Sequence, residues 1–237
     1  MSASFFKFLS EKEVKFVDFR FTDTKGKLHH TTQTTDAIDQ DLFKHGVMFD
    51  GSSIAGWKAI NQSDMILLPD PTSLKLDPFT AYPTAILNCD VIDPQDMKGY
   101  DKDPRHTARL AEQYLQTTGI GDTAYFGPEL EFFVFDKVRF DTGPYHSFYH
   151  LDSEELPSNN GNDSAAANLG HRPTVKGGYF PVPPVDSAFD LRQEMVDTLK
   201  EIGLDPVLLH HEVAPAQHEL GFKFDSLVKT ADNAQTY

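Results

Sequence analysis

The sequence contains a single cysteine, Cys89, among its 237 residues. One cysteine cannot form a disulfide within the chain, which argues against a disulfide-stabilised secreted domain and for a reducing compartment. No stretch approaches the roughly 20 consecutive apolar residues that a membrane-spanning helix needs, and the first residues lack the apolar core of a signal peptide. The composition therefore predicts a soluble, cytoplasmic protein with no membrane partner.

Basic residues are also scarce, with 21 lysines and arginines against 36 acidic residues and a formal net charge of −15. This charge repels phosphate backbones and argues against nucleic acid as a partner. Hydrophobic residues make up 39% of the chain and include 19 phenylalanines, which is enough apolar material for a core. A chain of this length suits one large domain or two smaller ones.

Strand and turn signals fill the first hundred residues. The expected elements are a β-hairpin over residues 14–32, a short helix that ends before Gly46, and strands over residues 65–68 and 84–91. They follow from alternating apolar residues, from turn chemistry and from prolines that separate the later strands. These elements predict a first domain over residues 1–100.

Helix signals enter in the second part of the chain, residues 101–237, which we expect to form a second domain that is incomplete at its C-terminal side. The expected elements are helices over residues 104–118, 187–202 and 226–237, strands over residues 129–135, 207–213 and 218–224, and a long surface excursion over residues 141–178, including 157–161. The helical spacing of Leu191, Met195, Leu199 and Ile202 predicts a core-facing stripe.

Two acids open a strand that is otherwise suited to burial. Glu129 and Glu131 alternate with Leu130, and Phe132 and Phe133 follow. Because side chains alternate between the two faces of a strand, the two acids share a face and lie about 6 to 7 Å apart. Such a pair in a low dielectric favours a divalent cation, and Mg²⁺ or Mn²⁺ prefers carboxylate oxygens. The alternative is a strand end whose acids face solvent.

A second pair of acids favours the metal interpretation. Glu212 ends one expected strand and Glu219 lies near the start of the next, so that the two face each other across a turn. Together with Glu129 and Glu131 they place four acids at strand termini of one domain. His211 and His218 are either further ligands or residues that pack beneath the acids.

Two polar segments have both a ligand-binding and a purely structural interpretation. Residues 49–57 contain Asp50, Ser53 and two glycines, which form either a ligand-binding loop or an Asp-Gly turn whose serines bond their own backbone. Residues 176–184 place Tyr179 between glycines and prolines, which either present it rigidly to a ligand or pack it as an ordinary tyrosine.

Four segments, in this order along the chain, resemble type I glutamine synthetase: Phe49-Asp50-Gly51-Ser52-Ser53, Gly127-Pro128-Glu129-Leu130-Glu131-Phe132-Phe133, Lys176-Gly177-Gly178-Tyr179-Phe180-Pro181 and His211-Glu212-Val213-Ala214-Pro215-Ala216-Gln217-His218-Glu219. The resemblance spans nearly the whole chain. It implies an α+β fold, with an amino-terminal β-grasp domain followed by the first part of a catalytic α/β domain, a funnel of antiparallel strands with flanking helices. The implied reaction is ATP-dependent ligation of ammonia to L-glutamate through γ-glutamyl phosphate.

The resemblance also implies roles for individual residues. Glu131, Glu212 and Glu219 would bind one Mg²⁺ or Mn²⁺ ion. Glu129 would contribute to the binding of a second ion. Asp50, Ser53 and Tyr179 would form the ammonium site. Phe224 would border the nucleotide site, and its alternative interpretation is an ordinary core phenylalanine. Asp50 would enter a neighbouring subunit's site, which implies two stacked hexameric rings, a homo-oligomeric dodecamer.

Two departures from the family pattern carry expectations of their own. The sequence stops at Tyr237, about half of what the family's enzyme requires, so we expect a fragment that is inactive alone. Val207 stands where the family usually has a glutamate that contacts the nucleotide. The rival interpretations are a glutamate–amine ligase of the same superfamily and a non-catalytic structural relative; the intact Asp50 and Ser53 favour ammonia over a larger amine.

Overall fold

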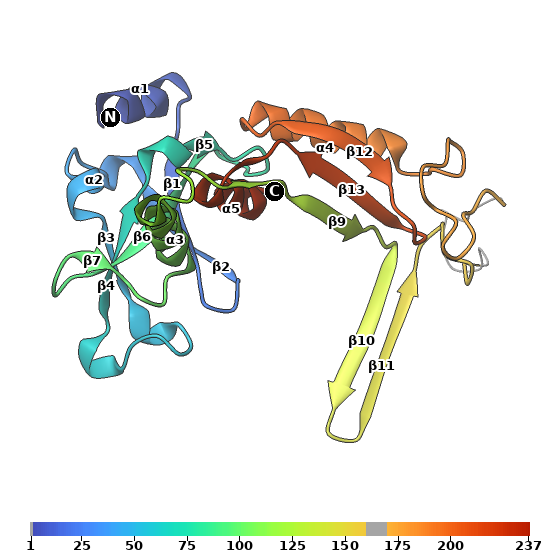
Figure 1. Cartoon of the computed structure of the whole chain (residues 1–237), viewed down its shortest axis with the longest axis horizontal. Coiled ribbons are helices and arrows are strands. Elements are labelled where there is room, and N and C mark those ends of the chain that lie inside the picture. Colours follow the sequence, from blue (N-terminus) through green and yellow to red (C-terminus); the bar gives the residue numbers. More distant parts are fainter. Residues whose placement is uncertain (1, 160–169) are drawn as a thin grey trace. The chain divides into compact units, whose positions relative to one another are not determined.

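The computed structural model describes residues 2–159 and 170–237, which fold as two compact units (Figure 1). Unit 1 comprises Met1–Phe126 and Phe224–Tyr237, and unit 2 comprises Gly127–Lys223. The chain therefore leaves unit 1 once and returns to it. Within the described residues, no helix is both long enough and apolar enough to cross a bilayer.

Unit 1 contains one large sheet, a short two-stranded ladder and four α-helices. Its elements are α1 (Ser2–Glu11), β1 (Phe16–Thr22), β2 (Leu28–Thr34), α2 (Leu42–His45), β3 (Val47–Asp50), β4 (Asp64–Pro69), β5 (Lys75–Leu76), β6 (Thr84–Asp93), β7 (Lys98–Gly99), α3 (Pro104–Thr118), β8 (Tyr125–Phe126), β14 (Asp225–Ser226) and α5 (Leu227–Thr236). The strand order is β2-β1-β6-β4-β3, and β5 and β7 also pair with β6.

The predicted hairpin and strands of this unit are confirmed. β1 and β2 pair antiparallel, while β1 and β6 pair parallel at the centre of the sheet. The predicted helix after Asp103 is α3, which ends at Gly119 in a left-handed conformation. Asp103 caps it by accepting a hydrogen bond from the backbone nitrogen of Arg105 at 2.9 Å.

A continuous apolar cluster lies against the sheet of unit 1. Phe5 of α1, Phe19 of β1, Met65 of β4 and Leu87 of β6 are all at most 1% exposed. Trp57, in the loop after β3, joins the same cluster and contacts Phe21 and Tyr100. Burial on this scale stabilises a fold by roughly 1.5 to 3 kcal/mol per large apolar side chain.

An arginine network joins α3 and α5 to the sheet within unit 1. The guanidinium of Arg105 donates to carboxylates of Asp70, Asp90 and Asp232 at 2.5 to 3.0 Å. Asp232 lies on α5, so the helix at the end of the sequence is bonded to residues of the first half. Burial alone would raise the pKa of Asp70, but hydrogen bonds from Thr72 and from Arg105 lower it.

Within its described residues, unit 2 contains two small sheets and one helix. Its elements are β9 (Glu129–Phe133), β10 (Lys137–Gly143), β11 (His146–Asp152), α4 (Phe189–Glu201), β12 (Pro206–His211) and β13 (Gln217–Phe222). The strand order β12-β13-β9 is antiparallel throughout, and α4 packs against β12. The strands predicted from residues 129, 207 and 218 onward are thus confirmed as neighbours in one sheet.

The long excursion predicted for residues 141–178 is wrong in its first part. β10 and β11 pair antiparallel from Lys137↔Asp152 to Gly143↔His146 and form the two-stranded arm seen in Figure 1. Aromatic and aliphatic residues placed among the polar ones allow these segments to form a two-stranded ribbon. Its aromatic residues, such as Phe140 and Tyr149, are exposed. The part of the prediction that falls on residues 160–169 lies outside the described residues.

The buried stripe of α4 differs from the predicted one. Leu199 is buried, but Leu191 is 41% exposed, and the other buried residues of the helix are Arg192 and Val196. Residues 192, 196 and 199 still follow helical spacing. The helix is rotated from the expected orientation because a buried arginine, which has polar partners in this unit, replaces a leucine on the core side.

Candidate functional site

Three antiparallel strands of unit 2 bring the predicted acids to one face. Glu131 of β9 pairs with Glu219 of β13, which pairs in turn with His210 of β12. Residues that are directly opposite on neighbouring strands point to the same face, so these three side chains form a row across the sheet. Glu129 lies two residues before Glu131 and shares its face.

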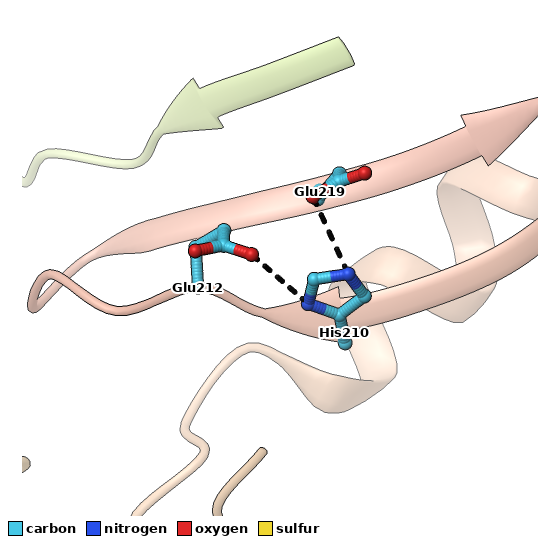
Figure 2. A group of neighbouring side chains, drawn as sticks. All are labelled: His210, Glu212 and Glu219. Atoms are coloured by element: carbon cyan, nitrogen blue, oxygen red, sulfur yellow. Dashed lines mark ion pairs between the residues drawn. The ribbon is translucent and has the colours of Figure 1, made fainter. Parts of the chain in front are cut away.

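Two members of this row, His210 and Glu219, form a close group with Glu212 (Figure 2). His210 Nδ1 lies 3.6 Å from Glu212 Oε1, and His210 Nε2 lies 3.4 Å from Glu219 Oε2. The imidazole therefore stands between two carboxylates that come from opposite sides of the β12–β13 turn. The backbone nitrogen of Val213 donates to the second Glu212 oxygen at 2.8 Å.

The charges of this face act on the carboxyl group of Glu219. Burial raises the pKa of its carboxyl group, and the nearby carboxylates of Glu129, Glu212 and Glu131 raise it further, although His210 opposes them. Glu131 is stabilised separately, since Gln217 Nε2 donates to its Oε2 at 2.6 Å. Four carboxylates on one face thus hold a concentration of negative charge.

The donor atoms of the group fit a divalent cation. One atom from each of His210, Glu212 and Glu219 lies within 4.8 Å of the other two. Donors around one ion lie about 2.0 to 2.3 Å from it, and hence up to roughly 4.5 Å from each other, so small side-chain rotations would complete the geometry. Carboxylates are the ligands that Mg²⁺ and Mn²⁺ prefer.

The opposite face of the same strands holds a buried polar network. His211 and His218, paired across β12 and β13, are each 1% exposed and point away from the acids. His211 Nδ1 faces the Glu212 carbonyl at 2.6 Å, and its Nε2 faces a Glu155 carboxylate oxygen at 2.7 Å. Both nitrogens meet acceptors, so the ring is held as an imidazolium. The two histidines therefore take the packing role among the alternatives that the sequence left open.

The pKa values of this network follow from its bonds. Burial alone would raise the pKa of Glu155, but hydrogen bonds from His211, Ser187 and Ala216 lower it to about 2. Burial alone would lower the pKa of His211, but the bond to Glu155 raises it. These opposite shifts describe a buried pair in which both partners stay charged.

His218 differs from its neighbour in charge state. Its Nδ1 accepts a hydrogen bond from Arg192 Nη1 at 2.9 Å. Burial and the positive charge of Arg192 lower the pKa of His218 to about 4, so the ring is neutral. Arg192 is itself paired with Asp186 and is 1% exposed. This arginine connects α4 to the strand that carries Glu219.

The segment around Tyr179 is bonded to the backbone that flanks Glu212. Gly178 N donates to Val213 O at 3.0 Å, and Phe180 N donates to His211 O at 3.4 Å. A Cβ atom at Gly178 would lie 2.5 Å from Glu212 O, so only glycine allows this approach. The exposed Tyr179 ring stacks on Phe180, whose centroid lies 4.7 Å from that of His210.

The remaining predicted site residues lie in unit 1. Asp50 accepts hydrogen bonds from the backbone and hydroxyl of Ser52 at 2.8 and 2.6 Å and from Ser53 Oγ at 3.2 Å, and these bonds lower its pKa. Asp50 and Ser53 are exposed. Phe224 is 57% exposed and its ring meets the edge of Tyr125 at 5.3 Å, so it is not a core residue.

Sequence reasoning missed three residues of this region. His210 could have been found, because strand alternation places it on the same side as Glu212. Glu155 and Arg192 carry no such signal: one lies in a loop and the other in an ordinary helix, and their partners are distant in the sequence. Only the tertiary structure brings them beneath the acids.

Comparison with known proteins links both parts of the chain to one family. The family models "Glutamine synthetase, beta-Grasp domain" and "Glutamine synthetase, catalytic domain" match residues 13–94 and 101–237. The chain is 58% identical over 231 residues to the glutamine synthetase of Rhizobium meliloti (strain 1021), covering 98% of this chain and 49% of that protein. It is 57% identical over 232 residues to that of Azospirillum brasilense, covering 98% and 50%.

The fold is similar to that of a solved glutamine synthetase from Plasmodium falciparum. The TM-score is 0.88 at 22% sequence identity, over 99% of this chain and 47% of the other. These findings confirm the predicted α+β class, with a β-grasp domain followed by a catalytic domain. The chain spans about half the length of the curated relatives that it matches.

Proposed function

Because this chain belongs to the glutamine synthetase family, we propose that the protein it represents ligates ammonia to L-glutamate, using ATP and passing through γ-glutamyl phosphate. The single observation that carries the proposal is the row of Glu131, Glu219 and His210 across three strands, with Glu212 beside it. A face this acidic is suited to hold the cations that a phosphoryl transfer between two anions requires.

The acids have separate roles in the proposal. Glu131, Glu212 and Glu219 would bind one Mg²⁺ or Mn²⁺ ion, and Glu129 would contribute to a second. Bound ions supply positive charge that offsets the charge of the transferring phosphoryl group. The protein's part is to keep the carboxylates on one face, which the register of β9 and β13 supports.

We place the ammonium site at Asp50, Ser53 and Tyr179. A carboxylate whose pKa is lowered stays ionised, so Asp50 would attract an ammonium ion. Its position beside that cation would let it accept the proton that ammonium must lose to become the nucleophile. In this proposal Asp50 acts in the site of a neighbouring subunit, within a dodecamer of two stacked hexameric rings. The exposure of the Asp50 loop is compatible with contact to another subunit.

Phe224 is the proposed border of the nucleotide site. Its exposed ring, supported from the side by Tyr125, offers a free face on which a base can stack. Val207 is also exposed and lacks the polar atoms that the usual glutamate would offer. The domain boundary near residue 100, the cytoplasmic location and the absence of nucleic-acid and membrane partners stay predictions.

The decisive experiment measures phosphate release by the natural protein that contains this chain, with Mg²⁺, ATP, glutamate and ammonium, and with each omitted in turn. We expect release to require all of them. Glu219→Gln should reduce the rate by at least about 100-fold, whereas Glu201→Gln, the same change at an exposed helix end, should leave it unchanged.

Two results would reject the proposal. Phosphate release that does not depend on ammonium would exclude this ligase reaction. Faster release with methylamine or ethylamine than with ammonium would instead identify a glutamate–amine ligase.

A further inference from the structure

We propose that Glu155 is a positioning residue that sets the geometry of the metal-binding acids from the opposite face of the sheet. The proposal rests on the proposed function, because it concerns the same acids. Glu155 lies in the loop after β11 and is 1% exposed. It touches none of the acids itself, and no sequence pattern marks it.

The Glu155 carboxylate collects hydrogen bonds from three different segments. Its Oε1 accepts from Ser187 N and Ser187 Oγ at 3.2 and 2.6 Å, and its Oε2 accepts from His211 Nε2 and Ala216 N, both at 2.7 Å. The contacts with His211 and Ala216 are buried and those with Ser187 are half-buried, and bonds to a charged acceptor are strong where water is largely excluded. One side chain thus joins the segment before α4 to both arms of the β12–β13 turn.

Its two contacts on that turn are close to the proposed ligands in the chain. His211 precedes Glu212 and Ala216 lies three residues before Glu219. His211 also donates through Nδ1 to Glu212 O at 2.6 Å, so the chain of bonds runs from Glu155 through the imidazole to the backbone of Glu212. Gly178 also lies against the Glu212 carbonyl, so closely that a side chain at residue 178 would collide with it. Glu212 therefore has little freedom to move while Glu155 is in place.

The contact with Ala216 holds an unfavourable backbone conformation. Ala216 has φ 63°, in the left-handed region that residues with a Cβ atom seldom adopt. Its amide donates to Glu155, and its carbonyl accepts from Val134 N at 2.9 Å. Such strained residues persist where their surroundings fix them. Without Glu155, the turn that sets the separation of Glu212 and Glu219 would be free to relax.

Titration of the chain with Mn²⁺, with free Mn²⁺ followed by electron paramagnetic resonance, tests the proposal. Glu155→Gln keeps the shape but replaces an acceptor oxygen by a donor, so it cannot satisfy all four contacts. We expect its affinity for Mn²⁺ to fall about 10- to 100-fold, the range typical of residues that support metal ligands.

The matched control is Asp18→Asn in unit 1. Asp18 is 3% exposed and accepts from an arginine, a histidine and a hydroxyl, namely Arg20, His30 and Thr32 at 2.8, 2.6 and 2.7 Å. Both substitutions should lower the melting temperature, but Asp18→Asn should leave Mn²⁺ affinity within about twofold of wild type, as expected for a carboxylate outside the support of the ligands. Equal affinity in Glu155→Gln and wild type would overturn the proposal.

A milder pair keeps the test valid if Glu155→Gln does not fold. Ser187→Ala removes one donor to Glu155 without burying an unpaired charge, and Thr32→Ala removes the matching hydroxyl from Asp18. We expect a measurable loss of Mn²⁺ affinity only in Ser187→Ala, and no difference between the two would contradict the proposal. Failure of the wild-type chain to bind Mn²⁺ would reject the proposed metal site itself and this inference with it.

Discussion

The two units bury different chemistry against their sheets. In unit 1 a continuous cluster of aromatic and aliphatic side chains, from Phe5 to Leu87, packs on the central strands. In unit 2 the largest fully buried side chains include Arg192, His211 and Glu155, beside a single leucine of β13. Apolar packing is non-directional, whereas buried polar bonds fix distances and angles.

The difference matches what the proposed function requires of each unit. The acids of unit 2 lie on or beside strands whose other face carries the polar network, so the directional bonds of that network constrain the positions of the acids. Unit 1 presents Asp50 on a loop whose own hydroxyls hold the carboxylate, and its core needs only to support that loop. We therefore expect unit 1 to resist unfolding through packing and unit 2 to depend on specific bonds.

The largest effect should come from the core of unit 1. Phe19→Ala removes a fully buried ring and should reduce the free energy of unfolding by about 3 to 5 kcal/mol. The only tryptophan, Trp57, is buried in the same cluster, so its fluorescence during urea unfolding reports on this unit. Phe140→Ala, at a 76% exposed ring of β10, is the control and should change stability by less than about 0.5 kcal/mol.

A slightly smaller loss should follow from breaking the arginine network of unit 2. Arg192→Ala leaves Asp186 without its cation and should cost about 3 kcal/mol. We expect urea unfolding followed by far-UV circular dichroism to gain an early transition, while the Trp57 transition stays in place. Arg139→Ala, at an exposed residue of β10, is the control. A common shift of both transitions would mean that the two units unfold as one.

Acid should destabilise unit 2 through Glu155. Its pKa is lowered from an ordinary value of 4.5 to about 2 by its hydrogen bonds, against the effect of burial. A carboxyl group with a lowered folded-state pKa stabilises the fold above pH 4.5, and this contribution is lost as the pH falls toward 2. Circular dichroism should show a larger loss of stability over this interval in wild type than in Glu155→Gln. Parallel pH profiles would contradict this assignment.

The smallest expected effect is a gain. Glu219 is directly opposite Glu131 and its pKa is raised, so its charge is unfavourable in the metal-free chain. Glu219→Gln should therefore increase the free energy of unfolding by about 0.5 to 1 kcal/mol in the presence of a chelator. Added Mn²⁺ should stabilise the wild type and not this variant. A destabilised variant in chelator would mean that the ion pair with His210 outweighs the repulsion.

Strand alternation and capping signals were sufficient to predict much of the architecture. Local patterns account for the hairpin of β1 and β2, the helix after Asp103 and the pairing of β12 with β13. The arm of β10 and β11 was missed because the Ser-, Asn- and Gly-rich composition further along outweighed the strand signal of residues such as Phe148 and Tyr149. The assignment of individual ligands stays a prediction.

Tertiary contacts explain the remaining misses. Arg192 was not placed in the core because helical periodicity counts apolar residues, and its partners Asp186 and His218 lie in other segments. Glu155 is an ordinary loop acid until His211, Ser187 and Ala216 surround it. Sequence patterns carry information about residues at a fixed spacing along the chain. The partners of Arg192 and Glu155 do not lie at such a spacing.

The short β8–β14 ladder has a consequence for the order of folding. Phe126 pairs with Asp225, so the strand that leads into unit 2 and the strand that leads out of it are hydrogen-bonded to each other. Unit 2 is thus an insertion closed at its base, and the bond between Arg105 and Asp232 forms only after residues 127–223 have been synthesised. During translation, α3 is therefore synthesised before the whole inserted unit, and its contacts with α5 can form only after that unit has emerged from the ribosome.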